Sequence, residues 1–147
     1  MCESPKLVRV ARIDPRARMP HFAHIGDSGF DIYTIERVIL NSNERRVLKT
    51  GLRVELPEGH EMQIRPRSGI SLLTPLTVLL GTVDSGYRGE IGVIVHNTSS
   101  GEFVVNAGER IGQGVVVKLP TIELIEIHED ELSETARGKG GFGSTGR

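Results

Sequence analysis

Short segments in which apolar residues recur at every second position make up much of the chain, and this spacing restricts its fold most. In residues 52–66, "LRVELPEGHEMQIRP", the alternation runs on both sides of a turn at 57–59, which predicts a β-hairpin. Residues 91–95 have the same period, and residues 111–119 and 121–127 carry further β-branched runs separated by Pro120. The chain is therefore predicted to consist mainly of short strands.

Turn-forming residues separate these strands at regular intervals, and helical patterns are weak. Turn clusters, chiefly of glycine, serine and aspartate, lie at 84–89, 98–101 and 107–109. The best helix candidate, residues 68–73, is short and is followed by Pro75. These features predict an all-β domain, a jelly-roll-like sandwich or barrel.

Two predicted strands are apolar on both faces. Residues 77–83, "TVLLGTV", and 91–97, "IGVIVHN", carry more apolar surface than one small sandwich normally buries. We therefore expect the protein to be an oligomer.

Composition narrows the class of protein. The 147 residues, 37% of them hydrophobic, suit one domain with a real core. A net charge of -1 gives no general field that would attract nucleic acid or an anionic membrane. Cys2 is the only cysteine, and we find neither a signal-peptide core nor an apolar run of membrane-spanning length. We expect a soluble, intracellular, cytoplasmic protein without nucleic-acid or membrane partners.

The C-terminal segment 137–147, "RGKGGFGSTGR", differs from the domain expected over residues 1–136. Five of its eleven residues are glycine, and Phe142 is its only large apolar side chain. Composition alone favours a disordered tail, because glycine loses much conformational freedom on ordering. Yet hydroxyls, three basic residues and accessible backbone N–H groups would also suit a phosphorylated ligand, with Phe142 stacked on a flat ring.

Three other stretches carry residues suited to chemistry, although each has a simpler interpretation. "RPRSG", residues 65–69, places a guanidinium, a hydroxyl and a glycine where phosphate oxygens could bind, but such turns are common. In "GTVDSGYRGE", residues 81–90, turn geometry by itself accounts for Asp84. Asp31 in "DSGFDIY" could equally be an outward-facing strand residue. The five histidines lack the spacing of a metal site.

In order along the chain, "SGFDIY", "PRSG", "GTVDSGYRGE", "GERIGQG" and "RGKGGFGSTG" resemble the five motifs of the trimeric dUTPase family, the deoxyuridine triphosphate nucleotidohydrolases. The resemblance runs from about Gly29 to Gly146. Departures include Ser28, where the family often has alanine, and Glu109, Gly112 and Gly114 in the fourth motif. They put only local packing around Gln113 in question.

The resemblance implies hydrolysis of dUTP to dUMP and pyrophosphate by a water molecule that attacks the α-phosphorus. Asp84 matches the residue that orients and deprotonates this water. Mg²⁺, held mainly by substrate phosphates, would neutralise developing charge, and Asp31 would lie near it through a water. The reaction would limit uracil incorporation into DNA and supply dUMP for thymidylate synthesis.

The resemblance also implies a homotrimer with shared sites, in which the flexible C-terminal arm of one subunit closes over nucleotide bound by two others. Tyr87 would pack on deoxyribose and exclude a 2'-hydroxyl, while backbone groups between Thr82 and Gly92 read uracil. Phe142 would stack on the base. The implied substrate-binding residues are Arg67, Ser68, Gly69, Thr82, Val83, Tyr87, Gly92, Gln113, Arg137, Phe142, Gly143, Ser144 and Thr145.

Two alternatives share this fold. A dCTP deaminase would need a glutamate placed to protonate cytosine and a different arginine-serine motif, and we find neither. A nucleotide-binding regulator without catalysis would be expected to have lost Asp84 or the C-terminal motif, and both are present.

Overall fold

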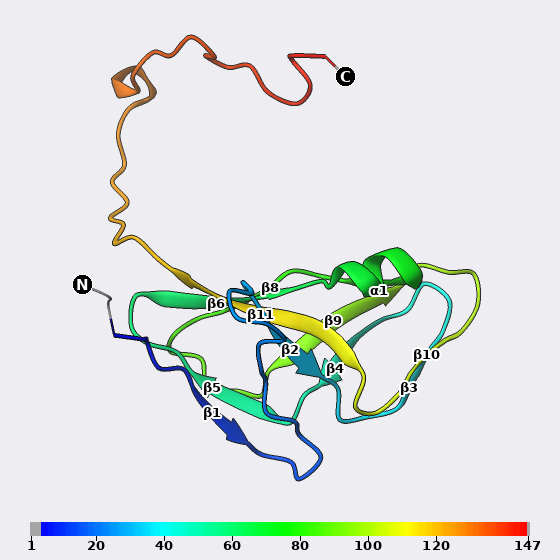
Figure 1. Ribbon diagram of the computed structural model, residues 1–147. Coiled ribbons are helices and arrows are strands. Elements are labelled where there is room, and N and C mark those ends of the chain that lie inside the picture. Colours follow the sequence, from blue (N-terminus) through cyan, green and yellow to red (C-terminus); the bar gives the residue numbers. More distant parts are fainter. Residues whose placement is uncertain (1–3, 147) are drawn as a thin grey trace.

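The computed structural model of the chain describes residues 4–146, so Cys2 and Arg147 lie outside the described residues. A compact body of antiparallel strands is followed by a long C-terminal segment that leaves it (Figure 1). The strands are β1 (Arg9–Arg12), β2 (Phe30–Tyr33), β3 (Val38–Leu40), β4 (Arg45–Lys49), β5 (Leu52–Glu55), β6 (His60–Arg65), β7 (Leu76–Val78), β8 (Gly81–Val83), β9 (Gly92–Asn97), β10 (Phe103–Val105) and β11 (Arg110–Lys118). The helices are α1 (Ser68–Leu73) and the 3-10 turn η1 (Glu129–Glu131). Within residues 4–146, no helix has the length and apolar character needed to cross a membrane.

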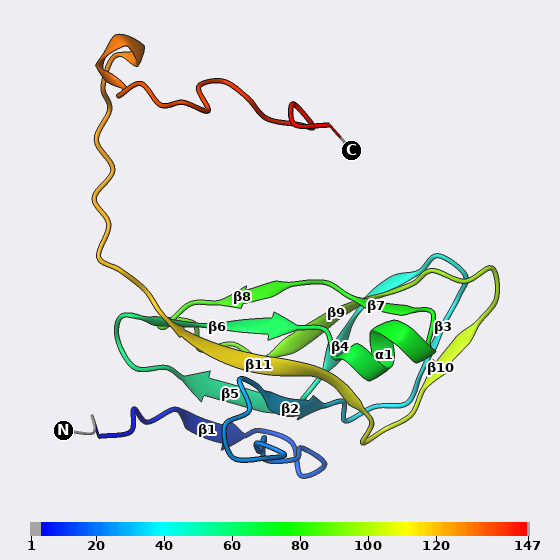
Figure 2. The same cartoon turned by 45° about the horizontal axis from the view of Figure 1, so that its top comes forward.

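Two larger sheets enclose one hydrophobic core. The first has the order β2-β11-β6-β8 and the second β4-β9-β7, with smaller pairs β1-β5 and β3-β10 (Figure 2). Ile64 of the first sheet, Val93 of the second and Leu40 of β3 belong to the same buried cluster. Alternate residues along each strand enter this cluster, which is the physical origin of the period of two in the sequence. The predicted all-β, jelly-roll-like fold is confirmed.

The predicted hairpin at residues 52–66 is wrong, although both of its strands exist. β5 pairs with β1, whereas β6 pairs with β8 and β11. Leu56 and Met62, on the two sides of the turn, are both buried. Because β5 and β6 lie in different sheets around one core, the turn at Gly59 is a corner between them and not the end of a ladder.

The local signals of helix and turn are confirmed. α1 occupies residues 68–73 and ends at Thr74, whose extended backbone precedes Pro75. Proline disfavours helical geometry at the residue before it, which explains this end point. The turn clusters at 84–89, 98–101 and 107–109 all lie between strands.

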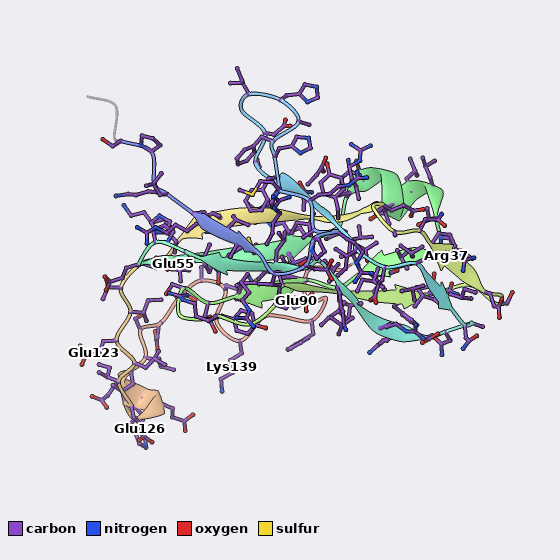
Figure 3. The ribbon with its side chains drawn as sticks, turned by 90° about the horizontal axis from the view of Figure 1, so that it is seen from below. Arg37, Glu55, Glu90, Glu123, Glu126 and Lys139 are labelled. Atoms are coloured by element: carbon purple, nitrogen blue, oxygen red, sulfur yellow. The ribbon has the colours of Figure 1, made fainter. Side chains whose placement is uncertain are left out.

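The β-branched run at 121–127 forms no strand in the described chain, so that part of the strand prediction is wrong. Every residue from 118 to 139 is exposed. Figure 3 shows Glu123 and Glu126 on this segment, outside the sheets. A strand needs a neighbouring strand for its backbone groups, and the segment has left the body that would supply one. The acidic stretch 129–134 that follows is exposed as well.

Apolar side chains remain exposed on the outer face of the body. Leu80 and Ile94, from the two stretches predicted to be apolar on both faces, are 63% and 40% exposed, and Val47 of β4 is 55% exposed. The core of one chain therefore leaves part of its strand-borne apolar surface uncovered.

Candidate active site

A hollow of about 380 Å³ lies between β8 and β9, and five of the sequence-predicted residues line it. They are Thr82, Val83, Asp84, Tyr87 and Gly92. Among the described strands, β8 pairs only with β6, so its other edge leaves backbone N–H and C=O groups without ladder partners. The segment from Thr82 to Gly92 runs from one sheet to the other without forming a hairpin, and the hollow exposes the unpaired edge of β8.

The turn that follows β8 holds Tyr87 in place. The Tyr87 N–H donates to the Asp84 carbonyl over 3.1 Å, and the Tyr87 hydroxyl donates to the Glu90 carbonyl over 3.0 Å. A Cβ on Gly89 would come within 2.2 Å of the Tyr87 hydroxyl oxygen, so only glycine at 89 permits this position of the ring. Asp84 is exposed. The turn thus presents a fixed aromatic ring and a solvent-accessible carboxylate beside one hollow.

The end of this turn that precedes β9 is hydrogen-bonded to the β4–β5 region. A carboxylate oxygen of Glu90, which Figure 3 places among the sheets, accepts from the Gly51 N–H over 2.9 Å. The Ile91 N–H donates to the Leu52 carbonyl over 2.7 Å. These bonds to the β4–β5 connection fix the loop without any β8–β9 ladder.

A second hollow, of about 370 Å³, lies where β6 ends. Residues from β2, β11 and the β6–α1 connection line it, including the predicted Asp31, Arg67, Ser68 and Gln113. The Gln113 amide donates to the Pro66 carbonyl over 2.9 Å. A Cβ on Gly29 would come within 2.5 Å of the Gln113 side-chain oxygen, so glycine at 29 leaves room for the amide. We call this the phosphate hollow, because its guanidinium, hydroxyl and amide groups are donors suited to phosphate oxygens.

Asp31 lies under the phosphate hollow between two arginines. It is only 7% exposed, and its Oδ1 lies 2.9 Å from Nε of Arg67. Its Oδ2 lies 3.4 Å from Nη1 of Arg110, a residue that sequence analysis did not select. Each carboxylate oxygen is therefore paired with a different guanidinium.

The described residues provide few side-chain ligands for a metal ion. Within residues 4–146, no group of three or more His, Cys, Asp or Glu side chains is placed to hold one. The Asp31 carboxylate, the one predicted to lie near magnesium, already faces two cations. This donor set fits a magnesium ion that takes most of its oxygen ligands from substrate phosphates and reaches the protein through water.

The unusual residues of the fourth motif have local explanations. A Cβ on Gly114 would come within 2.5 Å of the Phe30 ring, and one on Gly112 would lie 3.3 Å from the Arg65 carbonyl oxygen. Glu109 accepts from the Asn106 amide over 2.8 Å. The glycines therefore make room for Phe30 and for the neighbouring strand on either side of Gln113.

The remaining predicted residues lie outside both hollows. Gly69 is in α1 and lines neither of them. The C-terminal residues are on the segment that leaves the body, where Phe142 is fully exposed with a φ of +49°. The segment folds only on itself, as in the bond from the Ser144 N–H to the Gly141 carbonyl. Its predicted site residues are Arg137, Phe142, Gly143, Ser144 and Thr145.

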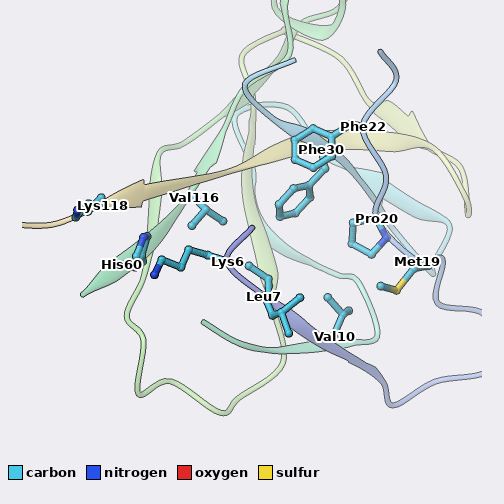
Figure 4. Close-up of a pocket in the computed structure, with 11 residues that line it drawn as sticks. Lys6, Leu7, Val10, Met19, Pro20, Phe22, Phe30, His60, Val116 and Lys118 are labelled. Atoms are coloured by element: carbon cyan, nitrogen blue, oxygen red, sulfur yellow. The ribbon is translucent and has the colours of Figure 1, made fainter. Parts of the chain in front are cut away.

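Sequence analysis missed several residues around the phosphate hollow: Arg110, Ala23, His24 and Asp27. His24 belongs to the loop before β2, for which the motif pattern gives no signal, whereas Asp27 begins the quoted stretch "DSGFDIY" but was assigned no role. A roomier hollow, about 590 Å³, lies along the N-terminal segment and β11 (Figure 4), but its lining is mainly apolar and contains none of the predicted site residues.

Comparison with known proteins assigns the chain to a family. The family model described as dUTPase matches residues 15–146. The chain belongs to the dUTPase family. Curated deoxyuridine 5'-triphosphate nucleotidohydrolases of Picosynechococcus sp. and Wolinella succinogenes are each 47% identical to it. These alignments cover 95% and 100% of this chain and 98% and 99% of the two relatives.

Solved dUTPase structures share the fold. The Staphylococcus bacteriophage 80alpha dUTPase with dUPNHPP has a TM-score of 0.90 at 33% identity, covering 96% of this chain and 99% of that one. A mutant dUTPase from phage phi11 of S. aureus, described with a structural Mg(II) ion, has a TM-score of 0.81 at 30% identity, covering 86% and 99%. The dUTPase match spans all five motifs, so the resemblance read from the sequence is confirmed.

Proposed function

We propose that this chain hydrolyses dUTP to dUMP and pyrophosphate, which would limit uracil incorporation into DNA and supply dUMP for thymidylate synthesis. The observation that carries the proposal is the placement of Asp84. It is an exposed carboxylate at the end of β8, beside a free strand edge and a fixed tyrosine ring, in a member of the dUTPase family. Curated relatives at 47% identity are dUTP nucleotidohydrolases.

Asp84 is the general base in this mechanism. It accepts a proton from a water molecule whose oxygen attacks the α-phosphorus, and the bond to the bridging oxygen then breaks to release pyrophosphate. The reach of such a base is about 2.6–3.2 Å to the water oxygen. An exposed carboxylate at a strand end is accessible to both water and substrate.

The hollow between β8 and β9 is the site for deoxyuridine. The free edge of β8 offers backbone donors and acceptors that can pair with uracil, and cytosine presents the opposite pattern at its exocyclic group. Val83 and Gly92 line the same hollow. The Tyr87 ring packs on the sugar and leaves no room for a 2'-hydroxyl, so UTP is excluded sterically.

The phosphate hollow holds the triphosphate. Arg67, Ser68 and Gln113 contribute a guanidinium, a hydroxyl and an amide, whereas Gly69, the residue after Ser68, lies outside the lining of this hollow. Mg²⁺ would supply charge neutralisation on the phosphate oxygens. Asp31 lies near enough to the hollow to contact the metal's water shell.

The two hollows of one chain serve different substrate molecules. Val83 lies opposite Met62, so Asp84 is level with Glu61, whereas Arg67 lies beyond the other end of β6. A strand advances about 3.3 Å per residue, so the six steps from Glu61 to Arg67 in extended backbone span about 20 Å. A base and the groups that grip the attacked phosphates need to lie much closer together than this. A complete site therefore combines Asp84 of one chain with Arg67 of another.

A homotrimer supplies this combination, with three sites that each use three chains. The exposed Leu80, Ile94 and Val47 would be covered by neighbouring subunits. The exposed segment after Lys118 extends away from its own body, as an arm that reaches another subunit would (Figure 1). Residues 1–136 then act as the β domain and residues 137–147 as its closing arm.

The arm closes over bound nucleotide. Phe142 stacks on uracil, while Arg137, Ser144, Thr145 and backbone N–H groups bind the γ-phosphate. Phe142 and Gly143 both have positive φ, a left-handed conformation that occurs in the tight turns where backbone N–H groups can bind anions. Closure excludes water that the reaction does not use.

Pyrophosphate release from dUTP, dCTP and UTP, measured side by side with magnesium, tests the proposal. Release from dUTP alone is expected. Deamination of dCTP would instead identify a deaminase, and tight dUTP binding without turnover would identify a regulator. Light scattering at assay concentration should give the mass of a trimer, and a monomer that turns over dUTP would refute the shared site.

A further inference from the structure

We infer that a second anion site lies beside the phosphate hollow, and that it binds pyrophosphate through Arg18. The site is a hollow of about 500 Å³, which we call the arginine hollow, lined by Arg18, Tyr33, Arg67, Gly108, Glu109 and Arg110. Of these residues, only Arg67 and Arg110 also line the phosphate hollow. The identity of the anion rests on the proposed function, because the proposed reaction releases pyrophosphate.

Packing holds Arg18 at the arginine hollow, although the residue is exposed. The preceding residue, Ala17, is buried in a small apolar cluster, which fixes the backbone at this point. The Arg18 guanidinium lies over the ring of the buried Tyr33, 5.3 Å from its centroid. A cation in this position is attracted to the face of the ring. A guanidinium held by its face keeps the N–H donors in its plane available to a ligand.

A tight turn beside the hollow leaves room for the Arg18 side chain. Gly108 has a φ of +81°, and a Cβ there would come within 2.9 Å of Nη2 of Arg18. The Gly108 N–H donates to the Thr34 carbonyl over 2.7 Å, and the Thr34 N–H donates to the Glu109 carbonyl over 3.0 Å. The turn is therefore fixed next to the end of β2, and glycine at 108 lets the guanidinium approach it.

A β-bulge brings Arg110 to the same hollow. The pairing of β11 with β2 shifts register between Arg110 and Gly112, and Ile111 enters the core. In a regular strand, Arg110 and Gln113 would point to opposite faces, because their separation is odd. Here both line the phosphate hollow, and Arg110 lines the arginine hollow as well. A β-bulge re-aims side chains in this way.

The charges that line the arginine hollow favour an anion with several negative charges. Three guanidiniums and one carboxylate give a net charge of +2, and counting Asp31, which pairs with two of the arginines, still leaves +1. The Glu109 carboxylate already accepts from the Asn106 amide over 2.8 Å. Within residues 4–146, no carboxylate lies within ion-pairing distance of Arg18. Pyrophosphate has oxygens at both ends, so it can accept from Arg18 and from a shared arginine at once.

The shared arginines make the two hollows compete. Because Arg67 and Arg110 belong to both, pyrophosphate in the arginine hollow engages donors that a bound triphosphate also needs. Pyrophosphate is therefore expected to inhibit competitively with dUTP. Arg18 lines neither nucleotide hollow, so it contributes to this inhibition without contributing to substrate binding.

The test measures pyrophosphate binding to the full-length protein in EDTA by calorimetry. Arg18→Gln should weaken this binding by roughly three- to thirtyfold, as expected for loss of a charge-assisted contact at an exposed site. Arg18→Lys keeps the charge and should recover part of the loss. Arg12→Gln is the matched control, because it removes an exposed arginine of β1 outside both nucleotide hollows and the arginine hollow. It should bind pyrophosphate normally.

Nucleotide measurements on the same variants separate this site from the substrate site. Arg18→Gln should keep its kcat/KM for dUTP and its affinity for dUpNHpp, a nonhydrolysed analogue, while its inhibition constant for pyrophosphate rises. Unchanged pyrophosphate binding, or an equal loss of dUpNHpp affinity, would overturn the inference. Inorganic phosphate that binds as tightly as pyrophosphate would overturn the assignment of the anion. A protein that binds pyrophosphate through Arg18 but does not hydrolyse dUTP would refute the proposed function and leave the anion site supported.

Discussion

Deleting residues 137–147 should remove most of the activity while leaving the fold nearly unchanged. In the described part of this segment, Phe142 is fully exposed. The backbone hydrogen bonds of the segment join only residues three positions apart. Within residues 137–146, no backbone hydrogen bond joins the segment to a strand, so the deletion leaves the sheets intact. Loss of a few local turns amounts to about 1 kcal/mol or less, which corresponds to a fall in Tm of about 2–4 °C at most for a chain of this size.

The expected loss of activity is far larger. Stacking of an aromatic ring on a base contributes about 1–3 kcal/mol, and a charge-assisted bond such as that of Arg137 to phosphate about 1.5–3 kcal/mol. Together these correspond to a reduction in kcat/KM of roughly 10²–10⁴-fold. Phe142→Ala loses only the stacking and should fall by about 5- to 150-fold, whereas Phe142→Trp keeps a ring and should retain much of the activity.

The assay compares kcat/KM for dUTP with the Tm of the unliganded protein, for the intact chain, the truncation and the two Phe142 variants. Leu132→Ala is the matched control, because it removes an exposed apolar side chain of the connector without removing a ring or a phosphate donor. A sharp fall in Tm on truncation would show that the arm is part of the fold. Unchanged kcat/KM would show that it does not close the site.

The remaining predictions concern the base, the shared site and two glycines. Asp84→Asn should lose most of kcat but keep its affinity for dUpNHpp, since the amide retains the shape and cannot accept the proton; turnover near that of the unaltered protein would exclude this base. Mixing Asp84→Asn chains with chains truncated before residue 137 should restore part of the activity through hybrid trimers, and no recovery after confirmed subunit exchange would contradict a site built from several chains. Gly89→Ala should displace the tyrosine ring that lies against it and reduce the ratio of kcat/KM for dUTP over UTP, whereas an unchanged ratio would remove that ring from sugar selection. Gly114→Val should collide with Phe30 and destabilise the fold by about 1–3 kcal/mol, seen as a lower urea midpoint, and an unchanged midpoint would show that the ring can move aside.

Local pattern was sufficient to predict most of the strands, because burial of alternate side chains and turn chemistry act over only a few residues. The six residues of α1 and its end before Pro75 follow in the same way. Strand pairing was not predictable by these rules. β5 and β6 are adjacent along the chain and yet belong to different sheets, because each completes a different side of one core. A turn sequence specifies that the chain reverses, but not which layer it enters.

The site was predictable to the extent that its residues follow one another in short motifs. Asp84 and Tyr87 share a single turn, and Arg67 and Ser68 are adjacent, so their motifs also place them together in space. Arg110 was missed although it lies within a quoted motif. The alternation of a regular strand sets it on the face opposite Gln113, and only the bulge brings the two together. Register shifts depend on pairing with β2 and are invisible in the local sequence.

The length of β6 explains why one chain can be well packed and still incomplete as an enzyme. Its inward residues Met62 and Ile64 are buried in the core, so the strand cannot shorten or bend to bring its two ends together. The proposed base lies near one end and the proposed phosphate donors lie beyond the other, separated by the same rigid element that stabilises the domain. The proposed association would resolve this conflict, because a neighbouring chain would present the opposite end of its own β6 without any change in the core. The exposed apolar side chains at Leu80 and Ile94 would then stabilise the contact that completes the proposed site.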